Sequence, residues 1–176
     1  PFELKHLEES MRSGSETTRL AVCGLLGQMR TWDGIPLLQQ ALKSSFPAVR
    51  AAAVYALKST AHVADLKPVA KHPKGFDLLA LRNATPATES ARRTQQAAIN
   101  VLKTASIHAD ANVREKACDA LGRVWVTEPV RLIRGLSDDE DPGVRIAAAT
   151  AAAVMNGSPG DSLVDQAEWM KTASTR

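Results

Sequence analysis

The chain has 176 residues, a mass of 18.8 kDa and a formal net charge of +3, with only 4% aromatic residues. This length is ample for one domain, and an apolar set dominated by Ala and Leu favours closely packed helices over a sheet. The longest apolar stretch, Ile146 to Met155, falls well short of the ~20 residues needed to cross a bilayer. Composition therefore excludes a β-rich fold and a membrane-spanning helix.

The predicted elements are helices paired into hairpins. Apolar residues recur at helical spacing, and Pro- or Gly-containing turns interrupt them. We read residues 1–176 as a single domain of about five hairpins, of which the third is irregular. The hairpins are expected at residues 2–30, 33–60, 61–87, 88–126 and 128–155, and a terminal capping helix at 161–172.

A nine-residue phrase recurs in the second helix of these hairpins. It reads VRAAAVYAL from Val49 and VREKACDAL from Val113, with degraded copies from Thr18 and Val144. The phrase arginines are separated by 31 (50 − 19), 64 (114 − 50) and 31 (145 − 114) residues. We interpret the middle gap as two periods with one unrecognisable copy. A fixed period of this size predicts a stacked repeat array.

The stretches Gly27–Leu57 and Ala120–Ala153 resemble short bacterial HEAT-like repeats, a type also found in phycobilisome lyase subunits. The resemblance implies an all-α fold, an α-solenoid wound as a right-handed superhelix. It does not identify a ligand, because members of this family bind very diverse partners. We expect a scaffolding module that binds a partner protein or peptide, without a cofactor.

The phrase arginine has two interpretations. In the repeats that this chain resembles, the equivalent residue pairs with acids or carbonyls at the turns between helices, which makes it structural. The alternative is a row that binds anions. The four arginines are Arg19, Arg50, Arg114 and Arg145, and the acids suitably placed are Asp110, Asp138, Asp139 and Asp141.

The two cysteines occupy one repeat position. Cys23 and Cys118 each lie four residues after a phrase arginine, and we place them three units apart. Stacked helices ~10 Å apart would separate them by ~30 Å, far beyond disulfide range. They are expected to be reduced and buried, which is compatible with a cytoplasmic protein.

The outward positions of the second helices predict the partner-binding surface. These positions lie two, five and nine residues after each phrase arginine: Ala52, Tyr55, Ser59, Lys116, Asp119, Arg123, Ala147, Thr150 and Val154. Tyr and Arg most often anchor protein interfaces, so Tyr55 and Arg123 are the leading candidates, with Lys116 and Asp119 beside them. The alternative is that Tyr55 only covers a neighbouring helix.

A basic stretch supports an alternative function. Residues 67–103 contain seven Lys or Arg and two acids, a net charge of +5. Clustered cations neutralise phosphates, so a nucleic-acid-binding or DNA-repair solenoid is the second hypothesis. The candidate contacts are Lys71, Lys74, Arg82, Arg92 and Arg93. The stretch is equally compatible with an ordinary solvated helix face.

Motifs for chemistry are missing from the sequence. The four histidines lack metal-ligand spacing, and no catalytic, metal or cofactor residue is predicted. A phycobilin lyase-type subunit remains a third hypothesis, which rests on repeat similarity alone. Trp32 and Trp125 are expected to pack between units. Because the chain starts at Pro1 directly before a helix, we expect it to be part of a longer protein.

Overall fold

The structure is a computed structural model that describes residues 2–62, 89–124 and 130–156. Within these ranges the regular structure is entirely helical. Its α-helices are α1 (Phe2–Ser13), α2 (Glu16–Met29), α3 (Ile35–Ala41), α4 (Pro47–Ala61), α6 (Glu89–Ala105), α7 (Ala111–Arg123), α8 (Val130–Gly135) and α9 (Pro142–Asn156). Short 3-10 helices, η1 (Trp32–Gly34) and η2 (Leu136–Asp138), lie before α3 and after α8.

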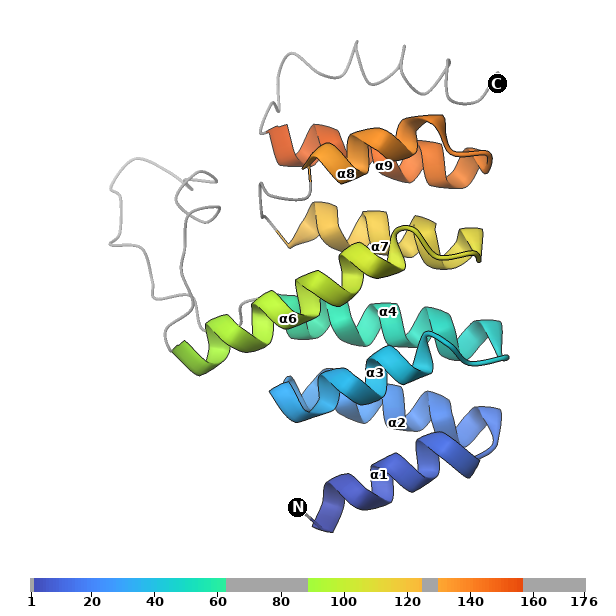
Figure 1. Cartoon of the computed structure of the whole chain (residues 1–176), viewed down its shortest axis with the longest axis vertical. Coiled ribbons are helices and arrows are strands. Elements are labelled where there is room, and N and C mark those ends of the chain that lie inside the picture. The colour runs from blue at the N-terminus through green and yellow to red at the C-terminus, as the bar shows by residue number, and fades with distance from the viewer. Residues whose placement is uncertain (1, 63–88, 125–129, 157–176) are drawn as a thin grey trace.

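The helices form two layers in a linear stack (Figure 1). The first helices of the hairpins, α1, α3, α6 and α8, lie in front of the second helices, α2, α4, α7 and α9. Each first helix packs on its own second helix, and the second helices pack in the order α2, α4, α7, α9. This arrangement confirms an all-α solenoid. The expected irregular hairpin and terminal capping helix lie outside the described residues.

One expectation about the stack is wrong. The 64-residue gap suggested a whole unit between the second and fourth hairpins, but α4 packs directly against α7. Arg50 of α4 donates to Asp110 at the start of α7, and Lys58 of α4 lies 2.9 Å from Asp119. The number of residues between two repeats does not show whether their helices are in contact, because the intervening residues need not lie between them.

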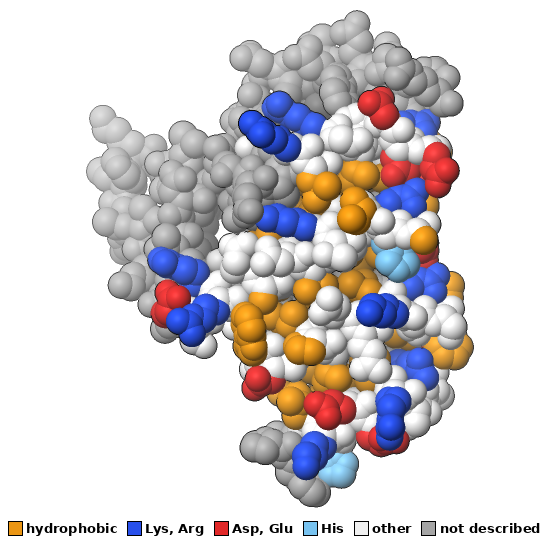
Figure 2. Space-filling model, in the orientation of Figure 1, with side chains coloured by type: hydrophobic (Ala, Val, Ile, Leu, Met, Phe, Trp, Pro, Cys, Tyr) orange, Lys and Arg blue, Asp and Glu red, His pale blue; other side chains and the backbone are white. Residues whose placement is uncertain are grey.

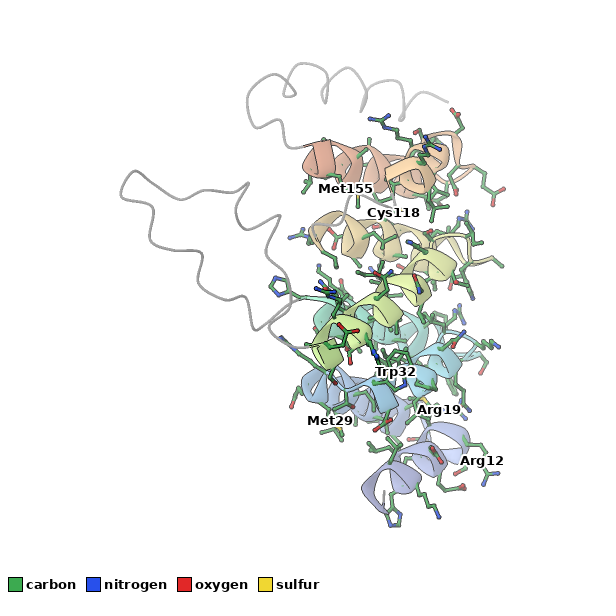
Figure 3. The ribbon with its side chains drawn as sticks, turned by 60° about the vertical axis from the view of Figure 1, so that its left-hand side comes forward. Arg12, Arg19, Met29, Trp32, Cys118 and Met155 are labelled. Carbon is green, nitrogen blue, oxygen red and sulfur yellow. The ribbon has the colours of Figure 1, made fainter. Side chains whose placement is uncertain are left out.

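The direct contact between α4 and α7 also changes the predicted distance between the two cysteines. Cys23 on α2 and Cys118 on α7 are two steps apart in the stack rather than three. Both are free and completely buried, as expected. Burial raises the pKa of the Cys23 thiol to about 11 and that of Cys118 to about 12. Figure 3 shows Cys118 inside the stack, where burial disfavours the charged thiolate, which is the reactive form of cysteine.

Local sequence sets the ends of the second helices. Ser15 caps α2 by accepting a hydrogen bond from the backbone N–H of Thr18, and Asp110 caps α7 through Asn112. Pro47 opens α4, where its missing N–H costs nothing. At the other end of α2, Arg30 adopts a left-handed conformation with φ 49°, which stops the helix.

Small residues allow two pairs of second helices to approach closely. A Cβ added at Gly27 of α2 would lie 3.0 Å from the Cα of Ala56 on α4. One added at Gly122 of α7 would lie 2.8 Å from the Cα of Ala151 on α9. Both glycines stand eight residues after the phrase arginine. Glycine has no side chain, so its presence at this repeat position allows the short separation between the two helices.

The phrase arginines join each unit to the turn of the next. Arg50 donates through Nε to Asp110 at 2.8 Å, and Arg114 donates through Nε and Nη2 to Asp139 at 2.9 and 2.8 Å. Arg19 instead lies 5.6 Å from the ring centroid of Phe46, a cation–π contact. The structural interpretation of the arginines is thus the one that their contacts support.

Each arginine also binds carbonyls of its own turn, which would otherwise lack partners. Arg19 donates to the carbonyl of Gly14, Arg50 to that of Ser44, and Arg114 to those of His108 and Ala109. Arg145 donates to the carbonyls of Asp139 and Glu140. Figure 3 shows Arg12 and Arg19 at the turn between α1 and α2.

One of the acids proposed for the ladder caps a helix. Asp141 accepts hydrogen bonds from the backbone N–H groups of Gly143 and Val144 at the start of α9. Arg114 contacts two acids of this turn, Asp139 and, at 3.4 Å, Glu140, which the sequence analysis did not include. Asp138 lies exposed in η2.

The glycine contacts predict opposite effects of one substitution on two helices. Gly122→Ala should lower the free energy of unfolding by about 1–3 kcal/mol, because the added methyl overlaps the α9 backbone. Gly24→Ala, on α2, should raise it by roughly 0.5–1 kcal/mol, because its methyl meets nothing and Ala favours helix. Urea unfolding followed by circular dichroism measures both. Equal effects of the two substitutions would contradict the close-approach account.

The ladder predicts acid sensitivity. The hydrogen bond from Arg114 lowers the pKa of Asp139, and that from Arg50 lowers the pKa of Asp110. Their stabilisation is therefore present above the unfolded pKa of about 3.9 and is lost as pH falls through the folded values. Asp139→Asn should lower the free energy of unfolding by roughly 3 kcal/mol at neutral pH, the cost of breaking a buried pair.

Asp110→Asn provides the matched comparison. The Asp110 side chain is 22% exposed and that of Asp139 only 8%, so Asp110→Asn should be the milder change. Asn at either position keeps an oxygen that can accept the backbone N–H. Urea titrations should show both deficits shrinking from about pH 4 downwards. A deficit that is constant with pH would mean that ion pairing is not the cause.

A candidate protein-binding groove on the second helices

The outward face of the second helices contains two hollows. The charged hollow, of about 960 Å³, lies over α4, α7 and α9. The small-residue hollow, of about 550 Å³, lies over α2 and α4. Tyr55 lines both, so they form one groove that runs along the stack. The structure places all nine outward positions expected from the sequence in one hollow or the other.

Small residues make up half of the lining of the small-residue hollow. Gly24 and Gly27 of α2 face Ala52 and Ala56 of α4 across it, with Ser59 beside them. A Cβ added at Gly24 would meet no atom within 4 Å. This end of the groove therefore has room for side chains from another molecule.

In the charged hollow, Asp119 pairs with two cations. Its carboxylate accepts from Lys58 on α4 at 2.9 Å and from Arg123 on α7 at 2.7 Å. Burial alone would raise the pKa of Asp119, but the hydrogen bonds from Arg123 and Lys58 outweigh it and lower the pKa. The same contact raises the pKa of Arg123. At neutral pH one carboxylate thus holds two cations at the groove surface.

Lys58 is the departure from the repeat in this hollow. It stands eight residues after Arg50, at the repeat position that Gly27 and Gly122 occupy in α2 and α7. Where the glycines bring backbones together, the side chain of Lys58 extends from α4 to Asp119 on α7. Sequence analysis missed Lys58, although its departure from the glycine position is visible in the sequence.

Apolar side chains form the walls. Tyr55 is 55% exposed, and Ile146 and Val154 on α9 are each 38% exposed. The Nζ of Lys116 lies 5.7 Å from the Tyr55 ring centroid, a cation–π contact across α4 and α7. Tyr55 is therefore accessible at the groove surface, while its ring also contacts Lys116 of the neighbouring helix. A mixed apolar and charged surface of this kind is typical of protein interfaces.

The two described basic positions proposed for nucleic acid, Arg92 and Arg93, do not line this groove. Arg92 and Arg93 lie on α6, a first helix, where both pair with Glu89 at 3.8 and 3.3 Å. On the first-helix face that Figure 2 shows, basic and acidic side chains are interspersed. Lys71, Lys74 and Arg82 lie outside the described residues.

The tryptophan expectation is wrong where it can be checked. Trp32 lies in η1 rather than in a second helix, and it is 54% exposed. The left-handed Arg30 ends α2 early and turns the chain, so Trp32 is carried out of the interface between units. Figure 3 shows Trp32 and Met29 near the same end of the hairpin. Trp125 lies outside the described residues.

Within the described residues, no helix has the length and hydropathy of a membrane span. No group of three His, Cys, Asp or Glu side chains within that part of the chain is arranged to hold a metal ion.

Comparison with known proteins agrees with the architecture. No curated protein matches the chain at a significant level. The family model described as HEAT repeats matches residues 4–103 and 96–167, which together span nearly the whole stack. On the strength of that match and of the stacked hairpins, the chain belongs to the HEAT-repeat family.

Proposed function

We propose that this chain is a protein-interaction module that binds a segment of a partner protein along the second-helix groove. HEAT repeats generally serve as interaction scaffolds, which supports the coarse function. The observation that carries the finer proposal is the exposed Tyr55 at the junction of the two hollows. A large aromatic side chain left in solvent, beside Lys116 and Arg123, is the composition of an interface hot spot.

The shape of the groove favours a polymer segment over a small molecule. Small-molecule sites usually enclose most of their ligand, whereas this groove is open along one layer of helices. Three stacked second helices extend over ~20–30 Å, a distance that about six to nine extended residues would span. The mechanism is complementarity of shape and charge, without covalent chemistry.

The nucleic-acid hypothesis has less support. The charged hollow has three cations, two carboxylates and apolar walls, whereas binding to a phosphate backbone relies on many clustered cations. The described basic residues of the 67–103 stretch that were proposed as contacts, Arg92 and Arg93, lie on another face. The phycobilin lyase hypothesis still rests on repeat similarity alone.

Peptide selection tests the proposal without a known partner. A random peptide library is panned on the folded protein, and the selected peptides are titrated by fluorescence anisotropy. Tyr55→Ala combined with Arg123→Ala should weaken them at least about tenfold, because both side chains anchor the segment. Helicity and melting temperature should stay nearly unchanged, since both side chains are mostly exposed.

The matched control is Gln96→Ala on α6, an exposed position of the first-helix layer. It should leave the affinity of the selected peptides unchanged. If the groove variant binds every selected peptide as tightly as the unsubstituted protein does, the groove is not the binding surface.

A further inference from the structure

We propose that the charged hollow selects an acidic partner segment, one that carries carboxylates next to a large apolar side chain. This inference rests on the proposed function and adds the chemical class of the partner. It is carried by three cations beside an apolar wall, of which two share the carboxylate of Asp119 and the third, Lys116, lies over the ring of Tyr55.

The cations outnumber the acids that compete for them. Lys58, Lys116 and Arg123 line the hollow, and Asp119 is shared between Lys58 and Arg123. Among the described residues, Lys116 has no carboxylate within ion-pair distance and contacts only the face of Tyr55. A cation held over an exposed ring, without a counter-ion, is positioned for an incoming carboxylate.

The second acid of the hollow is directed to a helix end. A Cβ added at Gly143 would lie 3.0 Å from Oε2 of Glu115, so this carboxylate lies against the first turn of α9. Negative charge is favoured there by the helix dipole, beside Asp141, which caps the N–H groups of Gly143 and Val144. With Glu115 at this edge, the three cations of the hollow still outnumber its two carboxylates, so its balance is positive.

The apolar wall selects the second feature of the partner segment, a large apolar side chain. Ile146 and Val154 on α9 and the ring of Tyr55 on α4 flank the cations. A segment that places a Leu or Phe against this wall would bring its neighbouring acids within reach of Lys116 and Arg123. A segment rich in Lys or Arg would meet the cations directly and be repelled.

Defined peptide pools test this selection. Three fluorescent pools of about ten residues combine Leu and Phe with Asp and Glu, with Asn and Gln, or with Lys and Arg. A labelled DNA duplex of about 20 base pairs serves as the polyanion comparison. Anisotropy titrations at low and moderate salt should rank the acidic pool first, at least about tenfold tighter than the other pools.

Charge reversal locates the contact. Lys116→Glu should weaken binding of the acidic pool at least about tenfold, because it replaces the cation that lacks a carboxylate partner. Arg92→Glu on α6 alters the net charge of the protein equally but lies on the first-helix layer. It should change the affinity by less than about twofold.

The outcomes separate this inference from the proposed function. Tyr55-dependent binding of all pools with similar affinity, or of the neutral or basic pool most tightly, overturns acidic selection and leaves a peptide-binding groove intact. Duplex binding that is tighter than acidic-pool binding, and lost in Arg92→Glu, overturns both in favour of nucleic acid. If no pool binds, both proposals fail. The expected ranking with the Lys116→Glu loss supports both.

Discussion

The contact between each phrase arginine and the turn of the following unit is the constraint on which the stack depends. A helical hairpin with an alanine-rich face buries too little surface by itself, so every unit needs a neighbour in a fixed register. The arginine supplies that register, because its rigid fork of donors binds its own turn and the next turn together. Arg50 donates hydrogen bonds to Asp110, and Arg114 donates to Asp139. Arg19 instead lies over the ring of Phe46. Buried charge is tolerated here because each donor has a partner.

Spacing between second helices then decides where a partner has access. Gly27 and Gly122 let α2 contact α4 and α7 contact α9 through backbone and Cβ atoms. Lys58 occupies the same repeat position in α4, and the α4–α7 step opens into the larger hollow. The larger hollow thus lies at the step where the repeat departs from glycine, and Lys58 supplies part of its charge. Tyr55 projects from the same helix into both hollows, so the larger hollow and the exposed aromatic coincide.

The sequence predicted the periodic features well, because periodicity follows from local helix geometry. The buried cysteines, outward positions such as Tyr55, and the structural use of Arg114 all derive from fixed offsets within one unit. It did not predict that α4 would lie directly on α7, since separation along the chain does not measure contact in space. It missed the exposure of Trp32, which depends on a left-handed residue that ends α2. The identity of the partner depends on complementarity with another molecule. A periodic sequence pattern carries no information about that molecule.

A double-mutant cycle between Arg50 and Asp110 tests the central claim most directly, because these residues are 60 apart in sequence and in contact only if α4 and α7 are neighbours. Free energies of unfolding are measured for Arg50→Met, Asp110→Asn and the double variant, and the cycle is repeated with Asp139→Asn in place of Asp110→Asn. The stack predicts a coupling of about 1 kcal/mol or more for Arg50 with Asp110, and a value within about 0.3 kcal/mol of zero for Arg50 with Asp139. Zero coupling in the first cycle, or equal coupling in both, would contradict it.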